Sequence, residues 1–134
     1  MSTKRVLTAA EVLAREEAKA KREALELALE QQLRALPAGG SCDRQFQFHP
    51  GRKWRADFAL VYMGRRLIVE VQGGLYARPG HAAGRHTRGA AIEKETEKFA
   101  HALMRGWMVL PVTGKQIKSG VALQWIEKIL GVQN

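Results

Sequence analysis

Residues 54–72, WRADFALVYMGRRLIVEVQ, predict a β-hairpin at the centre of the fold. Residues alternate between two faces on both sides of Met63-Gly64, a pair that can form the turn. We therefore predict strands at 54–62 and 66–72. One face of the first strand would carry Trp54, Ala56, Phe58, Leu60 and Tyr62.

The geometry of this hairpin brings its acidic residues together. A two-residue turn pairs Tyr62 with Arg65, which places Asp57 directly opposite Glu70. A turn one residue later would place Asp57 opposite Gln72 instead. In either register all three side chains lie on one face of the sheet, provided that no bulge or longer loop intervenes.

The rest of the chain predicts helices that cover a small sheet. Thr8 and Glu11 form a capping-box pattern that opens a helix over 9–36. Further helices are predicted at 90–105 and from a cap at Ser119, further strands at 44–49 and 107–112, and a long Gly-, Arg- and His-rich loop at 73–89. We expect an α/β or α+β fold in a single domain, residues 1–134, with a charged helical extension over 1–22 and a compact core over 23–134.

The composition favours a polyanionic partner. The formal net charge is +9 and the sequence pI is about 10.2, so nucleic acid is the first expectation. An anionic membrane surface, or solubility alone, would also account for the charge. No apolar run approaches the ~20 residues of a membrane span. The polar N-terminus and the single cysteine, Cys42, favour a reducing, cytoplasmic location.

The two acids of the hairpin lie in strongly basic surroundings. Between residues 44 and 92, Asp57 and Glu70 are the only carboxylates, and they are accompanied by nine Arg or Lys residues. Two carboxylates at ~4 Å repel by roughly 4 kcal/mol at an effective dielectric constant of 20. A divalent cation would convert that repulsion into binding, and Mg²⁺ prefers such oxygen ligands. We predict a Mg²⁺ site formed by Asp57, Glu70 and Gln72, with Mn²⁺ as a substitute. The alternative is a surface network of ion pairs with the neighbouring arginines.

These motifs resemble the PD-(D/E)XK, or restriction-endonuclease-like, nuclease superfamily. The matching parts are residues 54–58 with Asp57, residues 69–74 with Glu70-Val71-Gln72, and the later strand at 106–110. The region from Phe46 to Thr113 is similar to small phage and bacterial nucleases, with some similarity to very-short-patch repair endonucleases. The resemblance implies a mixed sheet flanked by helices and Mg²⁺-dependent hydrolysis of phosphodiester bonds, with Asp57 and Glu70 as metal ligands.

The main departure from the superfamily pattern is Gln72, which stands where the motif usually has a lysine. Some members supply this lysine from the following helix, and Lys98, or less favourably Lys94, could do so here. The alternative for Lys98 is a surface ion pair with Glu95 or Glu97.

The resemblance and the basic loop suggest further site residues. Members often add an acid from the first helix, for which Glu26 is the candidate metal ligand; the alternative is a solvated helical glutamate. His86 is a candidate general base or phosphate contact, and the alternative is a solvated loop histidine. The candidate DNA-binding residues are Arg52, Lys53, Arg55, Arg78, Arg85 and Arg88.

The leading functional hypothesis is a metal-dependent DNA endonuclease, with branched or otherwise structured DNA as a candidate substrate. One alternative is a nucleic-acid-binding module of the same fold that does not cleave. Another is an interaction protein that forms a homodimer or binds a protein partner through its N-terminal helix. RNA also stays open as a substrate, because contacts to a phosphate backbone do not identify the sugar.

Overall fold

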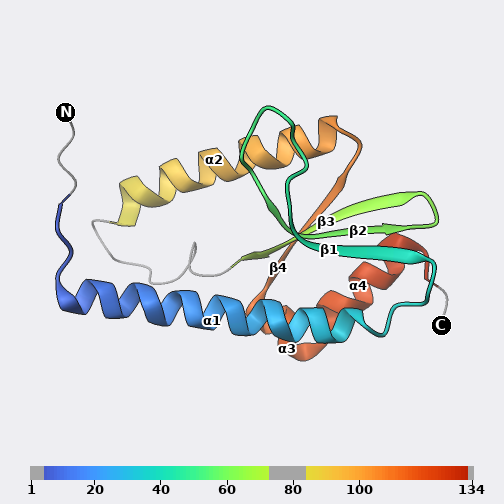
Figure 1. Cartoon of the computed structure of the whole chain (residues 1–134), viewed down its shortest axis with the longest axis horizontal. Coiled ribbons are helices and arrows are strands. Elements are labelled where there is room, and N and C mark those ends of the chain that lie inside the picture. The colour runs from blue at the N-terminus through green and yellow to red at the C-terminus, as the bar shows by residue number, and fades with distance from the viewer. Residues whose placement is uncertain (1–4, 73–83, 133–134) are drawn as a thin grey trace.

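The computed structural model describes residues 5–72 and 84–132, with side chains left undescribed at 84–88. A mixed four-stranded sheet lies between two layers of helices (Figure 1). Helix α2 covers one face, and α1 covers the other together with α3 and α4 (Figure 1). The elements are α1 (Ala9–Leu33), β1 (Gly40–Phe46), β2 (Ala56–Tyr62), β3 (Arg65–Gln72), α2 (Gly84–Met104), β4 (Met108–Thr113), α3 (Gly114–Ser119) and α4 (Val121–Leu130).

The first helix forms because its sequence lacks helix breakers and carries a cap. The hydroxyl of Thr8 accepts a hydrogen bond from the backbone N–H of Glu11 at 3.2 Å, as the sequence predicts. The Glu11 side chain does not complete the capping box and pairs with Arg5 instead. The helix ends at Leu33, three residues before the predicted end. Its second half buries Leu29 and Leu33 against the sheet.

The strands lie in the order β1-β2-β3-β4, with β4 parallel to β3 and the other pairs antiparallel. Tyr62 pairs with Arg65 and Phe58 with Val69, so the two-residue turn at Met63-Gly64 is confirmed. Met63 and Gly64 both have positive φ, 50° and 81°, which suits the tight hairpins that follow the twist of the strands.

The central strands separate at one end of the sheet. The pairing of β2 with β3 ends at Phe58 and Val69. Beyond that point β2 continues beside β1 as far as Ala56, whereas β3 continues beside β4 as far as Gln72. The sheet is therefore open between β2 and β3 at this end, and we call this opening the fork.

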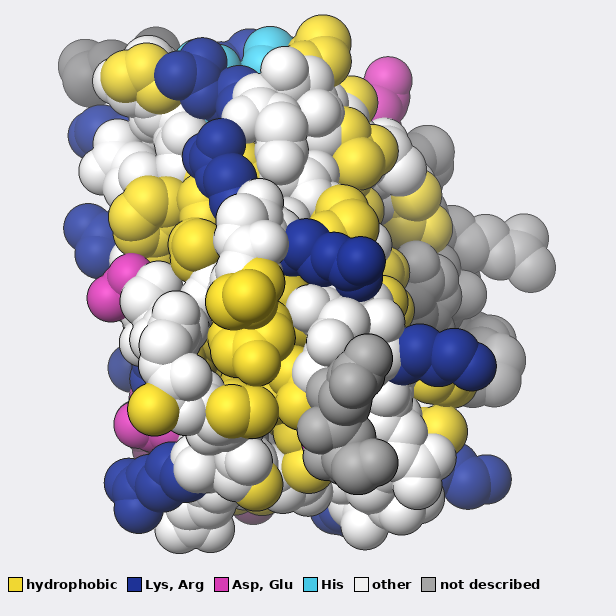
Figure 2. Space-filling view, turned by 90° about the vertical axis from the view of Figure 1, so that its right-hand side faces the viewer, with side chains coloured by type: hydrophobic (Ala, Val, Ile, Leu, Met, Phe, Trp, Pro, Cys, Tyr) yellow, Lys and Arg dark blue, Asp and Glu magenta, His cyan; other side chains and the backbone are white. Residues whose placement is uncertain are grey.

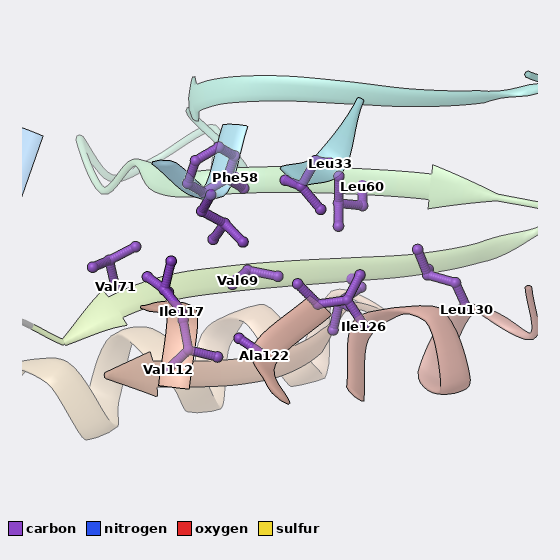
Figure 3. Close-up of a cluster of buried hydrophobic side chains, with 12 residues drawn as sticks. Leu33, Phe58, Leu60, Val69, Val71, Val112, Ile117, Ala122, Ile126 and Leu130 are labelled. Carbon is purple, nitrogen blue, oxygen red and sulfur yellow. The ribbon is translucent and has the colours of Figure 1, made fainter. Parts of the chain in front are cut away.

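Two hydrophobic clusters hold the layers together. The larger one joins α1, α3 and α4 to the sheet through residues such as Leu33, Phe58, Ile117 and Ile126 (Figure 3). The smaller one joins α2 to the opposite face and includes Ala102 and Trp107. Because both faces are covered, β2 is buried over five successive residues.

Several predicted boundaries are wrong. Helix α2 begins at Gly84, six residues before the predicted start, so part of the expected loop is helical. Strand β1 begins at Gly40, four residues early. A short helix, α3, was not predicted: Thr113 and Gln116 form a capping box there, and Ser119 is the last residue of α3 rather than the cap of the final helix.

The surface is rich in positive charge. Figure 2 shows many more Lys and Arg than Asp and Glu side chains on the face it presents, interleaved with apolar side chains. None of the helices in the described residues combines the length and the apolar character that crossing a membrane requires.

Candidate active site

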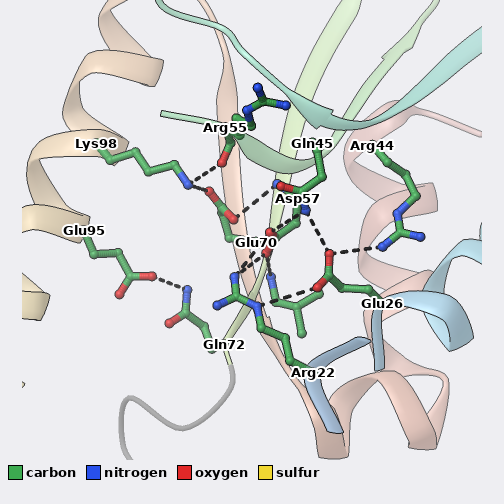
Figure 4. Close-up of polar contacts among 11 residues, drawn as sticks. Arg22, Glu26, Arg44, Gln45, Arg55, Asp57, Glu70, Gln72, Glu95 and Lys98 are labelled. Carbon is green, nitrogen blue, oxygen red and sulfur yellow. Dashed lines mark hydrogen bonds and ion pairs between the residues drawn. The ribbon is translucent and has the colours of Figure 1, made fainter. Parts of the chain in front are cut away.

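Three carboxylates are buried among the described residues, and they meet at the fork. Glu26, Asp57 and Glu70 are only 5%, 4% and 3% exposed. They come from α1, β2 and β3, and they lie in one polar cluster between α1 and α2 (Figure 4). Buried carboxylates are costly unless their charge is compensated, so their neighbours define what the site can do.

In the fork, hydrogen bonds to the side chains of Asp57 and Glu70 replace the backbone hydrogen bonds that are missing between β2 and β3. The backbone N–H of Val71 donates to Asp57 Oδ2 at 2.8 Å, and the backbone N–H of Asp57 donates to Glu70 Oε2 at 3.4 Å. Each carboxylate thus accepts a hydrogen bond from the opposite strand. These two bonds hold the acidic groups beside each other where the strands part.

The prediction that the three hairpin side chains share one face holds for Glu70 and Gln72 but not for Asp57. Glu70 and Gln72 contact α2, whereas the Asp57 carboxylate contacts Arg22 of α1. The two acids still meet, because both carboxylates reach into the fork (Figure 4).

The alternation of side chains between the two faces of the sheet breaks at Asp57 in β2. It also breaks at Gln45 in β1, whose side chain contacts Asp57. Phe58 belongs to the α1 side of the sheet, but Ala56, predicted for the same face, belongs to the α2 side. Gln45 has a φ of 51°, a conformation that is uncommon for residues other than glycine. We attribute the change of face to this local kink, which allows the Asp57 carboxylate to turn toward α1.

Helix α1 supplies a cation and a third acid to the site. Arg22 Nη2 lies 3.2 Å from Asp57 Oδ2, and Arg22 Nε lies 3.6 Å from Glu26 Oε2. The amide of Gln45 donates to Glu26 at 3.1 Å and to Asp57 at 3.4 Å. Glu26 also pairs with Arg44 at 3.2 Å. Glu26 is therefore not a solvated glutamate, and Arg22 is part of the site although the sequence placed it in the charged extension.

Helix α2 supplies the second cation. Lys98 Nζ forms an ion pair with Glu70 Oε1 and donates to the backbone carbonyl of Arg55 at 2.7 Å. The predicted alternative, a surface pair with Glu95 or Glu97, is wrong for this residue. Lys98 thus occupies the place from which a lysine of the following helix would reach the acids (Figure 4).

Gln72 is held by the same helix. Its side-chain amide donates to Glu95 Oε1 at 2.6 Å, while its own Oε1 is buried and has no hydrogen-bond partner among the residues that the structure describes. A buried oxygen without a partner costs free energy unless a ligand, an ion or water meets it. Gln72 therefore offers a neutral oxygen on the same side of the sheet as Glu70.

The electrostatics at Glu70 favour proton uptake in the absence of a divalent ion. Burial is the main cause that raises the pKa of Glu70 to about 8, and the adjacent Asp57 carboxylate raises it further. Lys98 opposes this shift without cancelling it. A pair of neighbouring acids, one of which resists ionisation, is typical of catalytic sites.

The donors at the fork fit a hard divalent cation. Asp57, Glu70 and the free Gln72 oxygen are oxygen donors of the kind that Mg²⁺ selects. In the part of the chain that the structure describes, no ready group of three or more His, Cys, Asp or Glu ligands is present. The carboxylates instead contact Arg22 and Lys98. A metal ion would therefore have to replace one or both of these cations, and would draw on Gln72 as a ligand.

The other predicted residues divide into two groups. Arg52, Lys53 and Arg55 are exposed in the segment that leads into β2, and the Arg55 carbonyl accepts a hydrogen bond from Lys98. Arg78, and the side chains of Arg85, His86 and Arg88, lie outside the described residues.

Sequence reasoning missed Arg22, Gln45 and Glu95. Only Arg22 had a usable signal, its i,i+4 spacing from Glu26.

Comparison of the chain with protein-family models, with curated proteins and with solved structures gave no match.

Proposed function

We propose that the protein is a metal-dependent DNA endonuclease with a restriction-endonuclease-like fold. The observation that carries this proposal is the pair of buried carboxylates, Asp57 and Glu70, in the fork of the sheet with a cation on each side. A protein gains little stability from burying such a pair, so a functional reason is the better explanation.

The divalent ion would be held by Asp57, Glu70 and Gln72. Glu26 would not contact the ion but would orient Gln45 and Arg22, which contact Asp57. When bound, Mg²⁺ lowers the pKa of a water molecule and offsets charge on the phosphate.

The chain's own cations have a separate task in this proposal. Lys98 and Arg22 have side chains that are 18% and 47% exposed, so both border solvent beside the buried acids. Each would turn from its carboxylate toward the phosphate, and Lys98 would supply the positive charge that Gln72 lacks. Their position on opposite helices brackets the acids from two sides (Figure 4).

The direct experiment is incubation with linear, nicked and four-way-junction DNA, in Mg²⁺ or in EDTA. Wild-type protein should cleave at least one substrate only in Mg²⁺, and Asp57→Asn should abolish cleavage while it retains DNA binding. Asp43→Asn is the matched control, because Asp43 is an exposed strand carboxylate away from the fork. Absence of Mg²⁺-dependent cleavage on every substrate, or equal activity of Asp57→Asn, would contradict the proposal.

The second candidate is a nucleic-acid-binding module of the same fold that does not cleave. The observation in its favour is that Arg22 and Lys98 already compensate the buried acids without a metal. This candidate predicts DNA binding with the same affinity in Mg²⁺ and in EDTA, and no product in either.

A further inference from the structure

A group of planar side chains lies next to the proposed active site and has no part in it. It consists of Phe48, His49, Arg52 and Trp54 from the segment between β1 and β2, and His101 from α2. We call it the ring cluster.

The ring cluster extends from the core toward the solvent. Phe48 is buried, 6% exposed, and its ring stacks on Trp54 with centroids 6.3 Å apart and planes at 17°. Trp54 is half-buried, and the guanidinium carbon of Arg52 lies 4.5 Å from its ring centroid. The Arg52 side chain is 46% exposed. The most exposed of these three side chains is therefore a cation.

Two imidazoles pack against Trp54. The ring centroids of His49 and His101 lie 5.7 Å and 5.1 Å from that of Trp54, and 5.2 Å from each other. The backbone N–H of Gly51 donates to His49 Nδ1 at 3.0 Å, which fixes the orientation of that ring. The cluster thus combines an ordered group of aromatic rings with the exposed guanidinium of Arg52.

Positive charge exceeds negative charge around these rings. The sequence Arg52-Lys53-Trp54-Arg55 encloses the indole between basic residues. Partial burial, followed by the charges of Arg105, His101 and Arg52, lowers the pKa of His49. The carboxylate partner of Arg52 is Glu97, and because both side chains are about half exposed, that pair holds Arg52 only weakly.

The ring cluster is close to the acids of the fork. Arg55, the residue after Trp54, accepts a hydrogen bond from Lys98 through its carbonyl, and Lys98 pairs with Glu70. On α2, His101 follows Lys98 by three residues, so the two side chains are neighbours on one helical face. A strand whose phosphate lies at Lys98 would have an adjacent base within reach of the rings.

We propose that the ring cluster binds an unpaired nucleobase of a DNA strand, by stacking against Arg52 and Trp54, next to the phosphate at the fork. This inference rests on the proposed function, and it makes the substrate a single-stranded, frayed or branched DNA rather than an intact duplex. Aromatic rings and guanidinium planes stack on any base, whereas a base inside a duplex is already stacked on its neighbours.

Binding can be measured without cleavage. A fluorescein-labelled twelve-nucleotide oligo(dT) and a blunt duplex of the same length would be titrated in EDTA, with anisotropy and tryptophan fluorescence as readouts. Arg52→Ala should weaken binding of the single strand roughly tenfold, and Trp54→Phe should weaken it by a smaller factor because the smaller ring still stacks. The duplex affinity should change by less than twofold. Trp54→Phe should also remove most of the fluorescence quenching that the single strand causes.

The matched controls are Trp125→Phe, a partly exposed tryptophan on α4, and Arg34→Ala, an exposed arginine at the end of α1. Both should bind the single strand like wild type. Equal losses for single strand and duplex in Arg52→Ala, or wild-type affinity for the single strand in both ring-cluster variants, would overturn the inference.

The outcome is separable from that of the proposed function. Selective single-strand binding without any cleavage in Mg²⁺ would support the ring cluster and reject the nuclease. Cleavage of all DNA forms that is unchanged in Arg52→Ala and Trp54→Phe would support the nuclease and reject the ring cluster.

Discussion

The raised pKa of Glu70 makes a quantitative prediction about metal binding. With a pKa of about 8, the carboxylate is ionised in roughly one molecule in ten at pH 7 and one in a hundred at pH 6. A divalent ion that needs the ionised form must displace the proton. The apparent dissociation constant for Mg²⁺ or Mn²⁺ should therefore fall about tenfold per pH unit from pH 6 to 8, and level off above pH 8.

Isothermal titration calorimetry at pH 6, 7, 8 and 9 measures this dependence directly. Repeating the titration at pH 7 in two buffers of different ionisation enthalpy should show the release of about one proton per ion bound. Glu70→Gln should lose both the pH dependence and most of the affinity. Glu93→Gln, which removes an exposed acid from α2, should behave as wild type.

The same shift predicts the stability of the metal-free protein. A carboxyl group whose pKa is higher in the folded state than in the unfolded state binds more protons when folded. Its contribution to the free energy of unfolding is complete below the unfolded pKa, near 4.5, and is lost as the pH rises to about 8. The wild type should therefore lose stability over this range by up to about 1.4 kcal/mol per pH unit more than Glu70→Gln. Metal affinity that is flat between pH 6 and 8, together with parallel stability curves for the two proteins, would show that Glu70 does not have a raised pKa.

Three further predictions concern stability. Arg22→Ala should lower the free energy of unfolding by about 1–3 kcal/mol, because it removes a partner of the buried Asp57 and Glu26 carboxylates. Saturating Mn²⁺ should restore the lost stability. A loss of stability that metal does not change would show that Arg22 is not part of the metal site. Thr113→Ala should cost about 1 kcal/mol in urea denaturation through loss of the α3 capping box, and no change would show that the cap is dispensable. Leu29→Ala should cost about 2–5 kcal/mol, because this side chain is fully buried in the larger cluster, and a cost below 1 kcal/mol would mean that the core collapses around the cavity.

The local pattern of the sequence was sufficient for the hairpin and for its register. The Met63-Gly64 turn and the alternation of residues 58–62 and 65–69 agree with each other, and this agreement set which residues pair. The helix over 9–33 and its apolar stripe followed in the same way from composition and spacing. The short helix α3 was not predicted from the sequence, because its N-cap residue, Thr113, is also the last residue of a strand.

The sequence alone determined that Asp57 and Glu70 would be close, since strand pairing is a local relation between residues 13 positions apart. Which charges compensate them depends on how the layers pack. Arg22 lies 35 residues from Asp57, and Lys98 lies 28 residues from Glu70, so both contacts depend on how α1 and α2 pack on the sheet. The change of face at Asp57 also could not be predicted, because simple alternation gives no sign of the positive φ at Gln45. The proximity of the two acids follows from the regular pairing of neighbouring strands. The identity of their cationic partners arises only when the helical layers pack over the buried carboxylates.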